Sequence, residues 1–416
     1  MQVLGHKSLG SKGKPLRILQ ITDTHLFPEG VSTFKTPTRV VNLKKENYGN
    51  EVAHRMLKKF VGEVDPHLVI FTGDIIDGRP FGEHKRNDWL DTFRKFIQPL
   101  IDAKIHWTYT PGNHDDDGAP YERKELLKIF SLPYSISQGA KTFNHTITVG
   151  PDKEDCVRLW LFDSGENHPK FKYTSFDLAS VSTYSAISKE LHEAKEKALG
   201  LAFFHIPLPE YGYIKPVKGT LGLFDAARHK GIVPKIAEIA PWFVKLIGQH
   251  RVVGSSMLDS GLFNAMAKNK NIVATFCGHD HYNDAVMRRE GIFLCYGRVS
   301  SRTPPIDWEG DGGELPFQLG ARVVEIETKK ADGSQQKFST WIQGERNGIE
   351  EDSHIVLYPY KDIAPPSAVC AKCINTLFSP HFLHFLLIVG LLLYILLYPE
   401  YRELSVEEIQ MKENWK

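Results

Sequence analysis

Five short segments of the sequence combine carboxylate, imidazole and amide side chains in a pattern that suits metal-dependent chemistry. In chain order they are Asp23-x-His25, Gly73-Asp74-x-x-Asp77, Gly112-Asn113-His114-Asp115, His205 and Gly278-His279-x-His281. Their oxygen and nitrogen donors are the ligand set preferred by Zn²⁺, Mn²⁺ or Fe ions. None of the five contains a cysteine, which argues against a closed structural zinc site. The glycines let the backbone turn sharply and keep such a site open.

Each segment follows a stretch with the pattern of a buried strand. Residues 68–72 (LVIFT) are apolar and β-branched, which predicts a central strand of a parallel sheet, and similar stretches precede the other segments. Helical spacing at 50–64 and 89–104 separates the first three. Strands that alternate with helices indicate a parallel sheet, whose ligands lie at the carboxyl ends of the strands. The five segments are therefore expected to meet at one edge.

The remaining pattern is less regular. Further helices are predicted at 122–130, 187–199 and 235–247, and further strands at 142–149 and 157–162. The last predicted strands, expected to be antiparallel, are at 285–287, 292–296, 321–326 and 338–342. Residues 208–270 are the hardest to interpret.

The order and types of these motifs resemble the calcineurin-like metallophosphoesterase superfamily. Within it, the chain is most similar to the short, atypical purple-acid-phosphatase-like branch, on the residues FFHIPLPEY at 203–211 and TFCGHDHYND at 275–284. LFDSG at 161–165 is a weaker match of the same kind, and the resemblance covers roughly residues 15 to 330. It implies an α/β fold, a four-layer α/β/β/α sandwich of two mixed sheets. It also makes 212–251 an insertion relative to the branch.

The resemblance implies two divalent or mixed-valence metal ions, of Mn, Fe or Zn, that share the Asp74 carboxylate. The other ligands of the first ion would be Asp23, His25 and His281. The other ligands of the second ion would be Asn113, His205 and His279. A shared anion reduces the repulsion between two neighbouring cations, and the cations lower the pKa of a bound water molecule.

Two further residues take catalytic roles in this resemblance. His114 would lie just outside the metal ligands, where it steadies the phosphate or protonates the leaving oxygen. Asp77 would orient His114. True purple acid phosphatases have a tyrosine at the position of Asp77 and Asp-x-Gly in place of Asp23-Thr24-His25, so no purple charge-transfer colour is expected.

These roles predict hydrolysis of phosphate esters by a metal-bridging hydroxide, with phosphoproteins or small phosphomonoesters as substrates. One alternative is a phosphodiesterase that acts on lipid-linked or glycolipid phosphodiesters. An alternative from another class is a membrane-anchored regulator or scaffold with a vestigial metal site. The formal net charge of +1 and the lack of a long basic run argue against a nucleic-acid partner, and no protein partner is predicted.

Several other residues have a simpler interpretation. Asp115-Asp116-Asp117 is expected to be a solvated turn, and Asp163 to cap a strand or serve the site. The five cysteines are too few for a disulfide framework. Of these, Cys370 and Cys373 are expected to be inert thiols, with acylation a less favoured alternative.

The C-terminal part of the sequence predicts a membrane anchor. Residues 382–398 (FLHFLLIVGLLLYILLY) carry no formal charge and would span about 25 Å as a helix, slightly less than a hydrocarbon core of ~30 Å. The predicted plan is a flexible N-terminus (1–14), a metallophosphoesterase domain (15–360), a linker (361–380), a transmembrane helix (381–399) and an acidic tail (400–416). This plan places a cytosolic catalytic domain on a membrane, for which the thin endoplasmic reticulum bilayer is a candidate.

Overall fold

The computed structural model describes most of the predicted catalytic domain. The described residues are 1–35, 40–42, 50–196, 198–212, 253–281, 283–284, 286–301, 318–327, 337–346, 348–349 and 354–358. All of them belong to one compact unit, Met1–Val217 with Gly222–Asp362. Within these ranges, no helix combines the length and apolar character needed to cross a bilayer. The predicted helix at 235–247 and the linker, anchor and tail predicted from 361 onward lie outside the described residues.

Among the described residues, seven strands form the sheet that carries the first three motifs, in the order β18-β17-β16-β3-β6-β7 with β19 beside β17. Its centre is parallel and consists of β3 (Leu16–Ile21), β6 (Leu68–Thr72) and β7 (His106–Thr110). Every residue of β6 is buried, as its apolar sequence predicts. The antiparallel flank consists of β16 (Gly320–Glu327), β17 (Lys337–Gly344), β18 (Gly348–Ile349) and β19 (Ile355–Tyr358).

The second sheet has eight strands in the described part of the chain, in the order β1-β8-β9-β12-β13-β15-β14 with β2 beside β8. Its parallel centre consists of β9 (Val157–Leu161), β12 (Leu199–Phe203), β13 (Ile272–Cys277) and β15 (Ile292–Tyr296). The strands β8 (His145–Gly150) and β14 (Val286–Arg289) run antiparallel to their neighbours β9 and β15.

The N-terminus is part of this second sheet. The strands β1 (Gln2–Val3) and β2 (Lys7–Ser8) pair in parallel with β8. The prediction of a flexible segment over 1–14 is therefore wrong for these residues. Backbone N–H and C=O groups make the pairing, so the polar side chains that suggested fraying do not oppose it.

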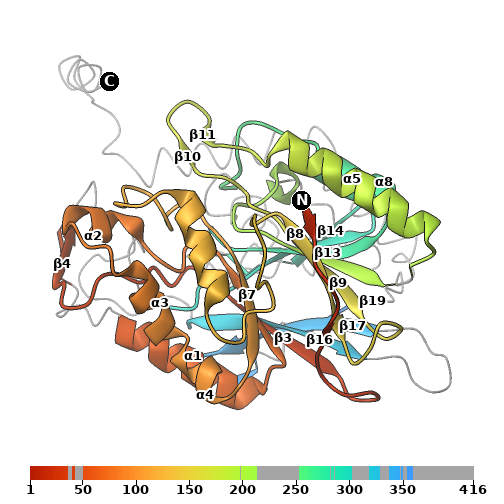
Figure 1. Ribbon diagram of the computed structural model, residues 1–416, viewed down its shortest axis with the longest axis horizontal. Helices are drawn as coiled ribbons and strands as arrows, with labels where there is room; N and C mark the ends of the chain where they lie inside the picture. Colours follow the sequence, from red (N-terminus) through yellow and green to blue (C-terminus); the bar gives the residue numbers. More distant parts are fainter. Residues whose placement is uncertain are drawn as a thin grey trace, which may run out of the picture. The chain divides into compact units, whose positions relative to one another are not determined.

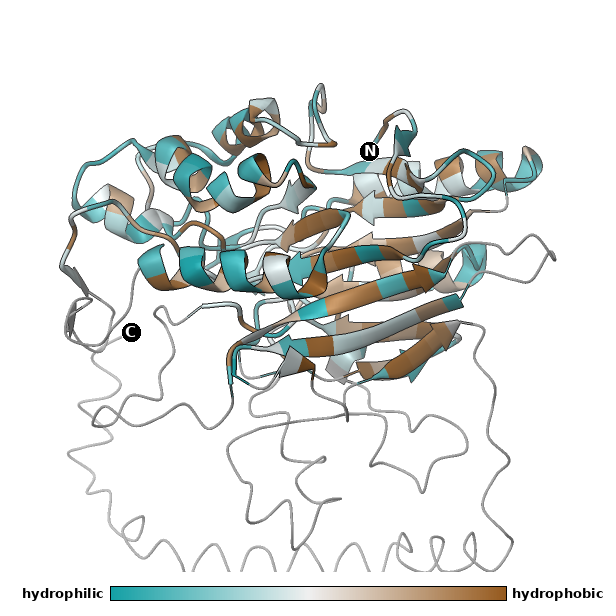
Figure 2. Cartoon of the chain, turned by 90° about the horizontal axis from the view of Figure 1, so that it is seen from below, coloured by the Kyte–Doolittle hydropathy of each residue, from teal (hydrophilic) through white to brown (hydrophobic). Residues whose placement is uncertain are grey.

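Helices cover the outer face of each sheet (Figure 1). Val69 and Phe71 of β6 pack in one hydrophobic cluster with α1 (Asn50–Val64), α3 (Trp89–Phe96) and α4 (Gln98–Asp102). On the second sheet, Trp160 of β9 and Ala202 of β12 cluster with α5 (Leu178–Glu193) and α8 (Leu262–Asn269). The helices expose hydrophilic residues on their outer sides (Figure 2).

The two sheets pack against each other through a third hydrophobic cluster. Leu68 and Ile70 of β6 lie in it with Leu201 and Phe276 of the second sheet. Since successive side chains of a strand point to opposite faces, β6 contributes to both the helical layer and the sheet interface. The predicted four-layer sandwich of two mixed sheets is confirmed for the described residues.

Some predicted elements differ from the observed ones. The helix predicted at 89–104 is two helices that meet at Ile97, because Pro99 lacks the N–H that would continue the first one. The helix predicted at 122–130 is the 3-10 helix η1 (Arg123–Ser131). The helix α5 begins nine residues before the predicted start at 187, where Asp177 caps the N–H groups of Ala179 and Ser180.

Several short elements have no sequence prediction. They are α2 (Gly78–Glu83), η2 (Pro209–Gly212), the pair β4 (Thr33–Lys35) and β5 (Val40–Asn42), and the pair β10 (Asn167–His168) and β11 (Lys172–Tyr173). The pair β10–β11 forms a projecting hairpin before α5 (Figure 1).

Candidate metal centre

The five sequence motifs meet at the carboxyl ends of β3, β6, β7, β12 and β13 and form two groups of possible metal ligands. The ligand atoms within each group lie within 4.8 Å of one another. The first group is Asp23, His25, Asp74 and His281. The second group is Asp74, His205 and His279. Asp74 belongs to both, so its carboxylate lies where a bridge between two cations would be.

In the first group, nitrogen and oxygen atoms converge on one point. The Nε2 atoms of His25 and His281 are 3.2 Å apart. His281 Nε2 is 3.2 Å from Asp23 Oδ1, and His25 Nε2 is 3.8 Å from Asp74 Oδ2. These two imidazoles and two carboxylates are the donor types that Mn²⁺, Zn²⁺ and Fe ions bind.

The second group converges on the same carboxylate. His205 Nε2 lies 3.1 Å from Asp74 Oδ2 and 3.2 Å from His279 Nδ1. The carbonyl oxygen of the Asn113 side chain is buried without a hydrogen-bond partner among the described residues. Buried polar atoms normally have partners. The unpartnered Asn113 oxygen, together with the shared Asp74 carboxylate and the two imidazoles, fits the binding of a cation.

The backbone at these ligands is unusual. Asp23, His25, Asp74 and His279 all have positive φ, at 56°, 46°, 49° and 75°. Non-glycine residues adopt this left-handed conformation at a cost of about 1–3 kcal/mol each, and such residues cluster at functional sites. The surrounding structure must therefore hold them.

Asp115 holds the loop that contains Asp74. Its buried carboxylate accepts hydrogen bonds from the backbone N–H groups of Asp74 (2.8 Å), Ile75 (3.0 Å), Ile76 (2.8 Å) and Gly112 (2.6 Å). Burial and the nearby charge of Asp74 raise the pKa of Asp115 to about 7. The prediction of a solvated turn is wrong for this residue.

Two glycines allow the close approach of the ligand loops. A Cβ atom on Gly112 would lie 2.2 Å from Asp74 Oδ1, and one on Gly278 would lie 2.7 Å from Asp23 Oδ2. Neither position has room for a larger residue unless a ligand carboxylate moves.

Hydrogen bonds at Nδ1 orient two of the imidazoles. His205 Nδ1 donates to the backbone carbonyl of Thr72 at 2.8 Å, and His25 Nδ1 lies 3.3 Å from Asp77 Oδ2. Both rings therefore direct Nε2 into the site, as metal-binding histidines do. Burial raises the pKa of Asp77, but the adjacent Arg79 guanidinium outweighs it and holds this pKa well below its usual range.

Asp77 does not contact His114, contrary to the prediction. The Asp77 carboxylate is bound by His25 and by Arg79, whose Nε donates to Oδ1 at 2.8 Å. His114 Nδ1 is instead 3.0 Å from Asp117 Oδ2, three residues further along the chain. The His114 side chain is 18% exposed, so it lies at the open side of the group. Asp117 is thus a site residue that the sequence analysis assigned to a solvated turn.

The remaining acidic residues near the site bind Arg123. Its guanidinium donates to Asp116 Oδ1 at 2.7 Å and to Asp163 Oδ1 at 2.6 Å. Asp163 also accepts from the backbone N–H of Gly165 at 3.0 Å. Asp163 therefore fixes the segment after β9, which agrees with the capping alternative.

The carboxylates and imidazoles of the site shift one another's pKa values. Burial raises the pKa of Asp23, but the charge and hydrogen bond of His281 outweigh it and lower this pKa to about 2. Burial lowers the pKa of His205, but the charge of Asp74 outweighs it and raises this pKa to about 9. The two carboxylates thus keep a proton on an imidazole, which shows how strongly this site attracts positive charge.

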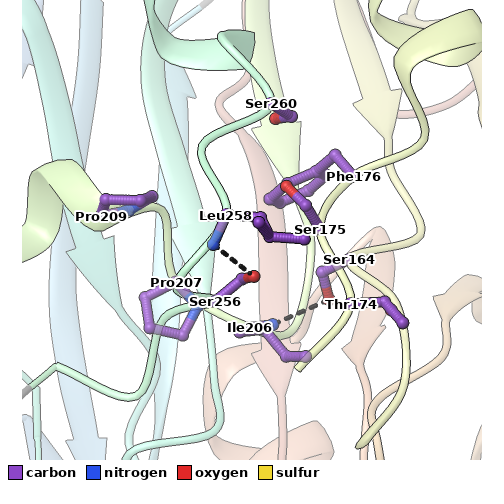
Figure 3. Close-up of a pocket in the computed structure, with 10 residues that line it drawn as sticks. All are labelled: Ser164, Thr174, Ser175, Phe176, Ile206, Pro207, Pro209, Ser256, Leu258 and Ser260. Carbon is purple, nitrogen blue, oxygen red and sulfur yellow. Dashed lines mark hydrogen bonds between the residues drawn. The ribbon is translucent and has the colours of Figure 1, made fainter. Parts of the chain in front are cut away.

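A small cavity lies beside Ile206, the residue that follows His205 in the chain (Figure 3). It has a volume of about 10 Å³, room for roughly one water molecule. The Ser164 hydroxyl accepts a hydrogen bond of 2.8 Å there from the backbone N–H of Ile206, next to His205. The cavity is too small for a phosphate ester, and its lining serves to hold the His205 segment in place.

A family model described as calcineurin-like phosphoesterase matches residues 16–283, a range that contains all seven candidate ligands. The chain belongs to the calcineurin-like phosphoesterase family. The resemblance inferred from the sequence motifs is confirmed.

Known proteins are similar to large parts of the chain. Probable inactive purple acid phosphatase 29 of Arabidopsis thaliana is 25% identical over 359 residues, which covers 78% of this chain and 81% of that protein. Phosphatase DCR2 of Saccharomyces cerevisiae is 32% identical over 255 residues, which covers 56% of this chain and 39% of that protein. The solved structure of a dimetal phosphatase from Danio rerio aligns with a TM-score of 0.47 at 13% identity, over 82% of this chain and 98% of that one.

Membership in the calcineurin-like phosphoesterase family supports metal-dependent hydrolysis of phosphoesters in general. The two residue groups that share Asp74 support a centre of two metal ions.

Proposed function

We propose that this calcineurin-like phosphoesterase hydrolyses phosphate monoesters at a centre of two metal ions. The observation that carries the proposal is the buried Asp74 carboxylate, which belongs to both ligand groups. One ion would be held by Asp74 with the residues Asp23, His25 and His281. The other would be held by Asp74 with the residues Asn113, His205 and His279. Bound there, the cations would acidify a water molecule and neutralise charge on the phosphoryl group.

The protein itself supplies orientation and a proton. His25 and His205 are held by Asp77 and by the Thr72 carbonyl, so their Nε2 atoms are fixed before a ligand binds. His114 is held through Nδ1 by Asp117, which leaves Nε2 to donate a proton to the leaving oxygen. A monoester dianion carries more negative charge than a diester, and two cations with the His114 imidazole at the open side of the site favour it.

The test uses the full chain loaded in turn with Mn²⁺, Zn²⁺ and Fe. An aryl phosphomonoester and an aryl phosphodiester are compared, beside Asp74→Asn and the exposed control Asp91→Asn. We expect monoester turnover that is lost in Asp74→Asn and kept in Asp91→Asn. Preference for the diester would make the chain a phosphodiesterase. No turnover with any metal, although two ions bind per chain, would support a regulator or scaffold.

We also propose that residues 382–398 anchor the protein in a membrane. The support is the sequence alone, seventeen residues without a formal charge. Fractionation of cells that express the full chain or a variant lacking 382–398 tests this. We expect the full chain in the alkali-resistant membrane fraction, and a soluble full chain would contradict the proposal.

A further inference from the structure

The β10–β11 hairpin is fixed beside the candidate metal centre. Its two strands pair antiparallel, with Asn167 opposite Tyr173. The Ser256 hydroxyl donates to the Tyr173 carbonyl at 2.9 Å, so the hairpin is attached to the segment before α8. The Tyr173 ring packs edge-on against His279, with 4.7 Å between ring centroids. The hairpin is therefore anchored on the side of the second ligand group.

Hydrogen bonds between Glu166 and Thr174 close the base of the hairpin. The backbone N–H of Glu166 donates to Thr174 Oγ1 at 2.7 Å, and the N–H of Thr174 donates to the Glu166 carbonyl at 2.8 Å. Gly165 has φ of 95°, and a Cβ atom there would lie 2.0 Å from Thr174 Oγ1. These contacts place the first strand residue, Asn167, in a defined position.

The Asn167 side chain contacts two residues of the candidate centre at once. Asn113 Nδ2 donates to Asn167 Oδ1 at 3.0 Å. Asn167 Nδ2 donates to Asp117 Oδ2 at 3.1 Å and is 3.4 Å from the Asn113 carbonyl. The same Asp117 oxygen lies 3.0 Å from His114 Nδ1.

Each contact has a consequence for the centre. Because Asn113 gives its amide N–H to Asn167, its Oδ1 is the side-chain atom left for a cation, and this oxygen is buried without a hydrogen-bond partner among the described residues. Because Asp117 accepts from Asn167 as well as from His114, its carboxylate is held in one orientation towards the imidazole.

We propose that Asn167 is a positioning residue that sets both the amide ligand of the second metal ion and the proton donor of the reaction. This inference rests on the proposed function for its second half only. The first half concerns metal binding and holds without turnover. The hairpin thereby supports the tasks of two neighbouring residues, Asn113 and His114, from a distant part of the sequence.

Two variants of the full chain separate these tasks. Asn167→Ala removes both contacts. Asn167→Asp keeps an oxygen that accepts from Asn113 Nδ2, but it cannot donate to Asp117 and brings a second negative charge next to it. The control is Asn87→Ala, at an exposed loop position. Mn²⁺ binding is measured by titration calorimetry, folding by thermal melting, and turnover on phenyl phosphate and on nitrophenyl phosphate.

We expect Asn167→Ala to weaken the second Mn²⁺ site by roughly 10–100-fold, the usual effect of losing a residue that orients a metal ligand. Asn167→Asp should bind Mn²⁺ as the unmodified protein does. Both variants should lose more turnover on phenyl phosphate than on nitrophenyl phosphate, because a poor leaving group depends most on protonation. Asn87→Ala should change none of these values.

The opposite results overturn the proposal. If Asn167→Ala binds two Mn²⁺ ions with unchanged affinity, or if its only change is a lower melting temperature, Asn167 has a structural role alone. An equal loss on both esters excludes the effect on the proton donor. If the unmodified protein turns over neither ester, the proposed function fails, and the Mn²⁺ titrations still decide the role of Asn167 at the second site.

Discussion

The Nε2 atoms of His25 and His281 face each other at 3.2 Å, although 256 residues separate them in the chain. His25 follows a strand of the first sheet, and His281 follows a strand of the second. The centre is therefore built across the edge where the two sheets meet, and the packing between the sheets sets the distance between its ligands.

The Asp74→Asn variant tests the shared carboxylate. An amide has one oxygen and no charge, so it cannot offset two cations, and we expect the Mn²⁺ content to fall from two ions per chain to one or none. Elemental analysis after gel filtration measures this, with Asp91→Asn as the matched control. Two retained ions in Asp74→Asn would show that Asp74 is not a bridge.

The structure assigns different partners to His25 and His114, and two matched variants separate them. Asp77→Asn removes the carboxylate beside His25 and should weaken Mn²⁺ binding by roughly 10–100-fold. Asp117→Asn removes the acceptor beside His114 and should leave Mn²⁺ binding intact while turnover falls by roughly 10²-fold or more. Titration calorimetry measures Mn²⁺ binding, and steady-state kinetics measures turnover. The reverse result would restore Asp77 as the partner of His114.

Asp115→Ala should lower stability more than it lowers metal affinity directly. Four backbone N–H groups lose their acceptor in this variant, and each unsatisfied buried donor costs about 1–3 kcal/mol. We expect a loss of more than about 3 kcal/mol of unfolding free energy in urea with a chelator present. Asp115→Asn keeps one acceptor oxygen and should lose less. Equal stability of Asp115→Ala and the unmodified protein would contradict this role.

The buried His145 imidazole should make the stability of the fold sensitive to acid. Burial lowers its pKa from 6.5 to about 4, and its ring contacts the Ser137 hydroxyl at 2.8 Å and the Phe143 carbonyl at 2.9 Å. Because the folded pKa lies below the unfolded one, this stability is present above pH 6.5 and is lost as the pH falls towards 4.

Urea unfolding of the metal-free protein at pH 7.5 and 5.0 checks this contribution. The His145→Gln variant should lose less stability between the two pH values than the unmodified protein, by about 2 kcal/mol. The control is His192→Gln, at an exposed position of α5, whose acid sensitivity should match the unmodified protein. An identical pH dependence for His145→Gln would show that His145 is not buried in its neutral form.

Regular periodicity made part of the fold predictable. The helix α1 begins and ends where its apolar spacing indicates, because the same face, including Met56 and Phe60, is buried on the sheet. The spacing at 89–104 concealed a break, since Ile97 and Leu100 fit one apolar face while Pro99 prevents a continuous helix. The N-terminal strands depend on a neighbouring edge, β8, which local sequence does not reveal.

The site residues also divide into those that local sequence predicts and those that depend on the fold. The candidate ligands were predictable because each follows a recognisable strand. The roles of Asp115 and Asp117 were not predictable from the sequence, because a run of three aspartates is typical of a solvated turn. Only the loop geometry sends Asp115 inwards and Asp117 towards His114. Asn167 lies in a two-residue strand without periodicity, and its contact with Asn113 spans 54 residues.

The position of β3 also determines when the centre can form during protein synthesis. This strand precedes Asp23 and His25, and its neighbours are β6 and β16. The strand β16 begins at Gly320, so one edge of β3 stays unpaired until about three hundred further residues have left the ribosome. An unpaired apolar edge invites pairing with other chains. Nascent chains and truncations that end before β16 therefore carry the first ligands beside a strand with one unpaired edge.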